Sequence, residues 1–450
     1  MYIKEIEFMN FRFFKKTKYC NFSNFNIIIG DNGIGKTSFI KGLNVLMAAF
    51  FDPIKYTAKH YFEKHDIRIN YDDMNPKYSP NVAINGIIVI NNNEFIVSRN
   101  LEKKGRRTQT IGNEFVREVE KIQEGVLNKE VIDLPVLVYY PATRDSNEVT
   151  IPLSSSIADF LKIKNPSVNY KDFLVWYEHQ IRDNERFIGY YNSTKPTTNY
   201  QFFLHWFKKI SLEANTSVDA LNKLNFVRTQ ILKSLDNFKE VLYSEKYDII
   251  LLVLNSGTII PINRLSDGYK RNLSIIGDIA FRCISLNPHL NNDANKSKGI
   301  VLIDEIDLHL HPTWQKEIIN DLTDLFPNLQ FFASTHSPFI IQELNNGTLI
   351  ELSKENAISI NSLNYSIEDI AEEIQGVENP QWSKKRIRMY EAASEYYRLL
   401  NEYSNDIKKE DLERLKIKLD ELTKPFADNL AYVALLEQQR LVAELQKMNK

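Results

Sequence analysis

The segment Phe25–Ile40 constrains this chain more than any other. An apolar run, Phe25–Ile29, leads directly into a glycine-rich turn, Gly30–Ser38, and an apolar helical pattern follows. The turn has the form G-x-x-x-x-G-K-S/T, in which glycines let successive backbone N–H groups converge on an anion at a helix N-terminus. The sequence therefore predicts a strand, a phosphate-binding loop and a helix, in that order, within an α/β fold.

This loop, called here the Walker A loop (Gly30–Ser38), also predicts its own ligands. Lys36 is expected to reach the β- and γ-phosphates of a nucleotide, and Thr37 to ligate Mg²⁺ through its hydroxyl. ATP and Mg²⁺ are thus the expected cofactors. The alternative, a glycine-rich turn with a solvated lysine, does not account for the strand before it and the helix after it. The phosphate contacts are expected from Asn32, Gly33, Ile34, Gly35, Lys36, Thr37 and Ser38.

A second apolar run, Gly299–Ile303, ends in two carboxylates. An unbroken apolar run is typical of a central parallel strand that is buried on both faces. Asp304 is predicted to hold Mg²⁺, directly or through water, and Glu305 to orient and polarise the attacking water. His336 follows a further apolar run and is predicted to contact the γ-phosphate or the water. A purely structural histidine is the alternative.

A Leu-Ser-Asp-Gly turn precedes an amphipathic helical pattern at Arg264–Leu273. We call Ser266, Asp267 and Gly268 the Ser266 turn. The first N–H groups of the helix and the Ser266 hydroxyl are suited to hold a γ-phosphate. Such turns normally complete the ATP bound by a facing subunit, so we predict that the ATP site is divided between two copies of the chain.

Other segments predict hairpins and helices. Val82–Ile90 and Glu94–Arg99 are expected to form two strands around a polar turn, and Asn255–Gly257 to turn a later hairpin. Tyr2–Phe14 has the alternation of one half-buried strand. A helical insertion is expected after Ile151, with one helix face made of Leu224, Val227, Ile231, Leu235, Phe238 and Leu242. A further leucine stripe is expected at Leu412, Leu415, Leu419 and Leu422.

These patterns divide the chain into four predicted segments. They are an N-terminal part of the head with an antiparallel β subdomain (1–150), a helical insertion (151–248), the remaining part of the head (249–352) and a helical extension for partner or self association (353–450).

Charge and cysteine content limit the class of protein. With 56 basic and 58 acidic residues, no global field drives the chain onto nucleic acid or anionic lipid. Two cysteines make a disulfide framework improbable, and no apolar run reaches the ~18 residues of a membrane span, so we expect a cytoplasmic protein with no membrane contact. The basic cluster Arg99–Gln109 is expected to be a solvated hairpin tip, and Lys384–Arg388 a helix surface or partner contact. Contact of either cluster with nucleic acid is the alternative. The acidic Ser366–Gln375 is expected to be an amphipathic helix.

In order and spacing, the motifs GDNGIGKTS, LSDGYK, VLIDE, IDLHLHP and STHS resemble those of the ABC-type ATPase heads of the SMC, Rad50 and OLD group. The resemblance covers roughly residues 1–350 and implies an α/β P-loop fold with a mixed central sheet and an antiparallel β subdomain. It implies that the Ser266 turn is the signature motif that binds in trans. It also implies that Asp307–Pro312, with His309 and His311, is a D-loop at the seam of a head-to-head homodimer or higher even-numbered oligomer.

The match departs from the group at two places. Asp267 and Tyr269 stand where Gly and Gln are usual, and the best match to the glutamine loop is the segment ending at Arg144. The longer segments LSDGYKRNLSIIGDIAFRCISLNP and GIVLIDEIDLHLHPTWQKEII are similar to the PtuA-like ATPases of bacterial anti-phage Septu and retron systems. That similarity implies a regulatory ATPase paired with a separate nuclease, typically of the HNH type.

Three other functions remain as alternatives. A DNA-repair or recombination ATPase of the Rad50 or SMC type would keep the chemistry and clamp DNA. A transporter's nucleotide-binding subunit is disfavoured by the unusual Ser266 turn and the long insertion. A nuclease in the same chain is disfavoured because no clustered carboxylates on strand ends follow Leu352.

Overall fold

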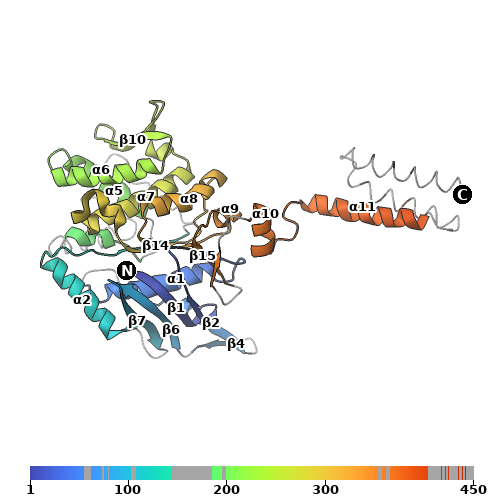
Figure 1. Cartoon of the computed structure of the whole chain (residues 1–450), viewed down its shortest axis with the longest axis horizontal. Helices are drawn as coiled ribbons and strands as arrows, with labels where there is room; N and C mark the ends of the chain where they lie inside the picture. Colours follow the sequence, from blue (N-terminus) through green and yellow to red (C-terminus); the bar gives the residue numbers. More distant parts are fainter. Residues whose placement is uncertain are drawn as a thin grey trace. The chain divides into compact units, whose positions relative to one another are not determined.

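The computed structural model describes residues 1–54, 62–72, 75–79, 81–102, 108–142, 185–194, 199–352, 357–360 and 365–403, together with positions 417, 421, 424, 434, 438 and 441. The chain divides into two compact units, Met1–Ile370 and Ala371–Lys450, and each is described by itself. All the described sheets lie in the first unit (Figure 1), and so do the five motifs from GDNGIGKTS to STHS.

A six-stranded mixed sheet forms the centre of the first unit. Its order is β16-β15-β3-β14-β13-β9, with β3 at Phe25–Ile29, β9 at Val136–Tyr140, β13 at Gly299–Ile303, β14 at Leu329–Ser334, β15 at Gly347–Glu351 and β16 at Ala357–Ile360. Strands β15, β3, β14, β13 and β9 pair in parallel, whereas β16 pairs with β15 in antiparallel fashion. Every residue of β3, β9, β13 and β14 is buried, as their apolar runs predicted.

An antiparallel sheet lies on the other side of helix α1 (Lys36–Met47) from the central sheet (Figure 1). Its order is β2-β1-β6-β7-β8, with β1 at Tyr2–Phe11, β2 at Phe14–Cys20, β6 at Asn81–Ile90, β7 at Asn93–Glu102 and β8 at Gln109–Ile111. Phe39 of α1 packs on Phe8 of β1, with ring centroids 5.3 Å apart. The predicted α/β class, with a mixed central sheet and an antiparallel β subdomain, is confirmed.

The first hairpin was predicted correctly, whereas the N-terminal strand was not. Between β6 and β7, Asn91 and Asn92 have φ values of 49° and 67°, which a two-residue hairpin turn requires and asparagine tolerates. The expected single strand over Tyr2–Phe14 is two strands, because the chain reverses at Arg12 and Phe14 pairs with Phe11. Smaller elements of this half are η1 (Ala48–Phe51), η2 (Lys64–Asp66), β4 (Ile69–Asp72), β5 (Asn75–Tyr78) and α2 (Asn113–Leu127).

Helix α7 (Asp267–Leu286) lies on the face of the central sheet opposite α1, and α5 (Asn199–Glu213) and α6 (Val218–Lys233) pack on α7 (Figure 1). The helix face predicted to extend to Leu242 is wrong beyond Lys233. Phe238–Ser244 is instead strand β10, because it pairs with β11 (Ile249–Leu254), whose apolar run needs a partner. The expected turn at Asn255–Gly257 is confirmed and leads to β12 (Ile259–Pro261), with Gly257 at φ 90°.

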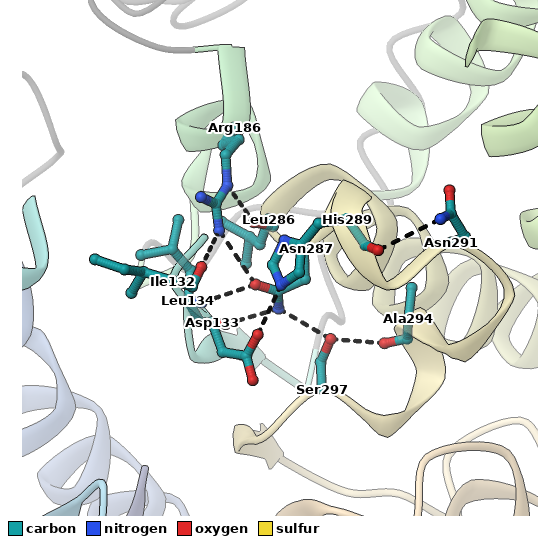
Figure 2. A network of polar contacts seen from close by, with 10 residues as sticks. All are labelled: Ile132, Asp133, Leu134, Arg186, Leu286, Asn287, His289, Asn291, Ala294 and Ser297. Carbon is teal, nitrogen blue, oxygen red and sulfur yellow. Dashed lines mark hydrogen bonds and ion pairs between the residues drawn. The ribbon is translucent and has the colours of Figure 1, made fainter. Parts of the chain in front are cut away.

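The C-terminal end of α7 is fixed by a polar network around Asn287 (Figure 2). Its amide oxygen accepts from the backbone N–H of Leu134 at 2.7 Å, and its amide nitrogen donates to the Leu134 carbonyl at 2.9 Å. The same nitrogen donates to Ser297 Oγ at 2.9 Å, and Arg186 donates to the Leu286 carbonyl at 2.7 Å. Leu134 lies two residues before β9, and Ser297 lies two residues before β13. The network therefore sets the position of α7 relative to these two strands of the central sheet.

The remaining elements complete both units. They are η3 (Glu185–Tyr190), η4 (Ile262–Arg264), η5 (Pro288–Lys296), α8 (Pro312–Leu325), α9 (Pro338–Gln342), α10 (Ile367–Asp369), the π-helical turn η7 (Ile370–Ile374) and α11 (Lys384–Tyr403). The acidic helix at Ser366–Gln375 is confirmed, and Lys384–Arg388 forms an exposed start of α11 apart from half-buried Ile387. None of the helices searched, which are those of the described residues, has the length and apolarity to cross a bilayer.

One basic residue is placed differently from expectation. Arg99 is not at a solvated hairpin tip but is fully buried in β7, where it pairs with Asp52 and donates to Thr110 Oγ1 at 2.6 Å. The predicted leucine stripe at Leu412–Leu422 and the match at Arg144 lie outside the described residues. The four-segment division of the chain stays a prediction.

Candidate nucleotide-binding site

The Walker A loop has the backbone that its glycines predicted. Strand β3 ends at Ile29 and α1 begins at Lys36, and Gly33 and Gly35 between them have φ values of 85° and 116°. L-amino acids with a side chain rarely adopt these values, so glycine is required here. Gly35 is the N-cap of α1, and no side chain caps the helix. The first N–H groups of α1 therefore border the loop, where a phosphate would meet them.

The Lys36 side chain is folded onto its own loop. Its ammonium donates to the carbonyl oxygens of Gly30 and Asp31 at 2.5 and 3.0 Å, and the residue is 8% exposed. Burial lowers the pKa of Lys36, while the charges of Asp31, Asp304, Glu305 and Asp307 act to raise it. The ammonium is thus a partly desolvated cation within the electrostatic field of the carboxylates of the VLIDEID segment. It lies beside the Walker A loop, where it could bind a phosphate.

Two carboxylates end strand β13 beside β14. Asp304 is 1% exposed, and its Oδ1 accepts a hydrogen bond from Ser334 Oγ at 2.6 Å. Ser334 Oγ also accepts from the backbone N–H of Glu305 at 2.8 Å. Glu305 has a φ of 52°, a left-handed conformation that costs about 1–2 kcal/mol for a residue with a side chain. Ser334 therefore orients the carboxylate of Asp304 and also holds the strained backbone of Glu305.

The segment after Glu305 is tied to the end of β14. Asp307 Oδ1 accepts from Thr335 Oγ1 at 2.6 Å, and the backbone N–H of Ile306 donates to the Ser334 carbonyl at 2.9 Å. His336 is next in the chain. Burial and the charge of Lys36 lower the pKa of His336, while the charges of Asp307, Glu305 and Asp31 raise it. Because the lowering dominates, the ring favours its neutral form, which is able to accept a proton from water or donate a hydrogen bond to phosphate.

The Ser266 turn occupies the N-terminus of α7. Ser266 is the N-cap, but its side chain makes no capping hydrogen bond, and both Ser266 and Asp267 are exposed. Among the described residues, no hydrogen bond or ion pair joins this turn to the Walker A loop. Ser266 and Asp267 therefore face solvent rather than the phosphate loop of their own chain.

Gly268 is in close contact with the D-loop segment of the same chain. A Cβ added to Gly268 would lie 2.7 Å from the carbonyl oxygen of His309 and 2.8 Å from the Trp314 ring. His311 is the N-cap of α8, with its Nδ1 3.1 Å from Thr313 Oγ1. The predicted trans residue Gly268 and the predicted seam segment are thus in close contact within one chain.

The structure brings most of the predicted site residues together. Lys36, Asp304, Glu305, Asp307 and His336 interact electrostatically where β3, β13 and β14 end. Ligands of open parallel sheets bind at this edge. Sequence reasoning did not assign roles to Ser334, Thr335 and Arg271. The hydroxyl residues follow the apolar run of β14 and were recognisable as its polar end, whereas Arg271 has no local signal.

The donor set suits a hard divalent cation. Mg²⁺ takes oxygen ligands, and the chain offers the exposed hydroxyl of Thr37 and the Asp304 carboxylate, which is already oriented by Ser334. A buried ionised carboxylate also needs cations or hydrogen bonds around it. Thr37 and Asp304 are therefore the residues that would hold Mg²⁺.

A family of known proteins matches the part of the chain that carries these residues. The family described as "AAA domain, putative AbiEii toxin, Type IV TA system" matches residues 25–342, well over half of the chain. The chain belongs to this family. The matched range begins with β3 and includes the Walker A loop, the Ser266 turn, the carboxylate pair and His336.

Individual relatives share most of the chain. The Retron Vc95 probable ATPase of Vibrio cholerae is 28% identical over 396 residues, covering 81% of this chain and 74% of the relative. The Retron Ec83 probable ATPase of Escherichia coli is 26% identical and covers 72% and 66%. The Septu protein PtuA of Bacillus thuringiensis is 25% identical and covers 85% of both chains.

Similar solved structures include heads of SMC proteins. The Smc head domain from Pyrococcus furiosus, bound to the C-terminal domain of ScpA, is 16% identical with a TM-score of 0.45 and covers 83% of this chain and 99% of the other. The SMC head domain from Thermotoga maritima is 13% identical with a TM-score of 0.41, covering 80% and 99%.

Proposed function

We propose that this chain hydrolyses ATP with Mg²⁺ in a head-to-head dimer, and that the dimer is the regulatory subunit of a bacterial anti-phage system. The observation that carries the ATPase is that Lys36, which follows β3, and the Asp304–Glu305 pair, which follows β13, lie at the same edge of the sheet, because both strands pair in parallel with β14. Three relatives in which the similarity spans most of this chain are named retron probable ATPase or Septu protein PtuA, which supports the biological setting.

In this proposal each residue has one task in hydrolysis. The Walker A backbone and Lys36 would bind the phosphates, and Thr37 and Asp304 would hold the metal. Bound Mg²⁺ would neutralise charge on the phosphate oxygens. Glu305 accepts a proton from the attacking water and aligns it, and His336 is a hydrogen-bond donor for the γ-phosphate or the water.

The exposure of Ser266 and Asp267 supports dimerisation. The turn presents an N-cap with no capping bond and does not bond to the phosphate loop of its own chain. ATP held by the Walker A loop of one copy and the Ser266 turn of the other binds fully only in the closed dimer. It therefore shifts the equilibrium towards closure, by an amount set by its differential affinity. Hydrolysis would release the two heads.

The first prediction tests the role of Glu305. Glu305→Gln keeps the side-chain volume but removes the proton acceptor, so ATP should remain bound and a dimer should accumulate on size-exclusion chromatography with light scattering. The control, Lys36→Ala, should neither bind ATP nor dimerise. Unchanged turnover in Glu305→Gln would refute the assigned role.

The proposal includes a separate nuclease partner, typically of the HNH type, as the resemblance to Septu and retron ATPases implies, and it includes no cutting by this chain. One relative, 23% identical over 82% of this chain, is named Endonuclease GajA, so the point needs a direct test. Purified chain with ATP and Mg²⁺ should leave DNA and RNA intact, and purification from the native host should recover a nuclease. Nicking by the chain alone contradicts the proposal. DNA-stimulated turnover with a steep salt dependence would instead favour the Rad50-type clamp.

A further inference from the structure

Arg271 joins the helix of the Ser266 turn to the catalytic carboxylates. It lies on α7, between one and two turns after the N-cap Ser266. Its Nη2 donates to the backbone carbonyl oxygens of Asp304 at 3.2 Å and Glu305 at 2.8 Å. Burial lowers the pKa of Arg271, and the charges of Asp307, Glu305 and Asp304 oppose that shift. The guanidinium is therefore a half-buried cation placed against the backbone of the residues proposed to bind metal and activate water.

The backbone of Glu305 is held from both sides. Its N–H donates to Ser334 Oγ at 2.8 Å, and its carbonyl accepts from Arg271 and from the N–H of Leu308 at 3.0 Å. The left-handed φ of 52° is unfavourable for glutamate, so it persists only because neighbouring groups fix it. Of these contacts, only the Arg271 contact comes from α7. A displacement of α7 would act on Glu305 through that side chain.

The first turn of α7 is also packed tightly on the segment after Glu305. Gly268 leaves no space for a Cβ against the His309 carbonyl, and the Tyr269 and Trp314 rings have centroids 4.2 Å apart. Close-packed contacts of this kind transmit small displacements rather than absorb them. A displacement of the Ser266 turn would therefore reach Glu305 within the same chain, through the packing of α7 and the hydrogen bond from Arg271.

We propose that Arg271 is a positioning residue that couples the two ATP sites of the dimer. The inference rests on the proposed function, in which Ser266 binds the partner's ATP and Glu305 serves the ATP of its own chain. When the partner's nucleotide engages the Ser266 turn, α7 is fixed and Arg271 holds Glu305 in its working conformation. Each site then hydrolyses efficiently only when the other site is filled.

The chemistry of arginine fits this task better than that of lysine. A guanidinium is a planar group with several N–H donors in fixed directions, whereas an ammonium is a point charge on a flexible stem. Arg271 Nε is buried and makes no hydrogen bond within the described part of the chain. Lysine would preserve the charge beside the carboxylates but not the fixed reach to two carbonyl oxygens.

The test compares Arg271→Met and Arg271→Lys with wild type in steady-state ATP hydrolysis. Wild type should show a Hill coefficient for ATP above 1 and at most about 2 for two coupled sites. Arg271→Met should lower kcat by about 10- to 100-fold, as small misplacement of a catalytic group does, with an unchanged KM and a Hill coefficient of 1. Arg271→Lys should recover part of kcat without the cooperativity.

The matched control is Arg228→Met, which removes another half-buried arginine from the neighbouring helix α6, where it stacks on Phe207. It should retain kcat and the Hill coefficient, so a loss of both in this control overturns the specific role of Arg271. A wild-type Hill coefficient of 1 also overturns the inference, whatever the variants do. Failure of Glu305→Gln to dimerise with ATP would instead refute the proposed function, whereas a normal dimer with full cooperativity in Arg271→Met refutes only the coupling.

Discussion

Replacing Ser334 by alanine tests whether a residue with no chemical role of its own organises Asp304 and Glu305, the two carboxylates proposed to act in hydrolysis. Ser334 is 1% exposed, and its hydroxyl donates to Asp304 Oδ1 at 2.6 Å and accepts from the N–H of Glu305 at 2.8 Å. Alanine removes both bonds and leaves a buried carboxylate and a buried N–H short of a partner. A hydrogen bond to a charged group contributes about 1.5–3 kcal/mol, and an orphaned buried group costs about 1–3 kcal/mol.

Since the two effects overlap, we expect Ser334→Ala to lose about 2–4 kcal/mol of folding stability. Turnover should fall by about 10- to 100-fold, because Glu305 is released from its left-handed conformation. Thermal melts and steady-state ATP hydrolysis measure the two quantities. The control is Ser297→Ala, another buried serine with two hydrogen bonds, to Ala294 and Asn287, but away from the carboxylates. It should lose stability and keep its turnover. Wild-type turnover in Ser334→Ala would refute the reasoning.

Two further predictions follow from burial. Gly268→Ala places a methyl group within 2.8 Å of the His309 carbonyl and the Trp314 ring. The free energy of unfolding, measured by thermal melts, should fall by about 1–3 kcal/mol, and ATP-dependent dimerisation should weaken. A variant with wild-type stability and dimerisation would contradict the packing. Burial, and then the charge of Lys208, lower the pKa of His205 to about 4. Between about pH 6.5 and pH 4 the unfolded chain protonates His205 while the folded chain keeps it neutral. The free energy of unfolding is therefore highest above about pH 6.5 and falls as the pH drops towards 4, with a loss of roughly 2 kcal/mol at pH 5. In thermal melts, the stability of His205→Gln should change less between pH 7 and pH 5 than the stability of wild type. An equal change in both proteins would disprove the assignment of this pH dependence to His205.

Features governed by neighbours in the sequence were predictable. The Walker A loop was recognisable because glycines at Gly33 and Gly35 are needed for positive φ values, whatever the rest of the fold does. The strands β3 and β13 were recognisable because continuous apolar runs are stable only inside a sheet. The Mg²⁺ roles expected for Thr37 and Asp304 then predicted that the Walker A loop and Asp304 belong to one site.

Features governed by distant partners were not predictable. Phe238 continued a helical pattern but lies in β10, because pairing with β11 outweighs local preference. Arg99 belonged to an apparently solvated basic cluster but is buried, because Asp52 and Thr110 supply its partners. Ser334 and Arg271 acquire their roles only by lying beside Asp304 and Glu305, 29 to 34 residues away in the sequence.

The sequence by itself thus determined the phosphate loop, the buried strands and the identity of the charged groups, because backbone conformation and apolar burial are set locally. Only the tertiary structure decided which hydroxyl and which guanidinium hold Glu305, and that the Ser266 turn faces away from its own phosphate loop. Hydrogen bonds and ion pairs depend on where the folded backbone brings two groups within about 3 Å, and no spacing along the chain encodes that distance.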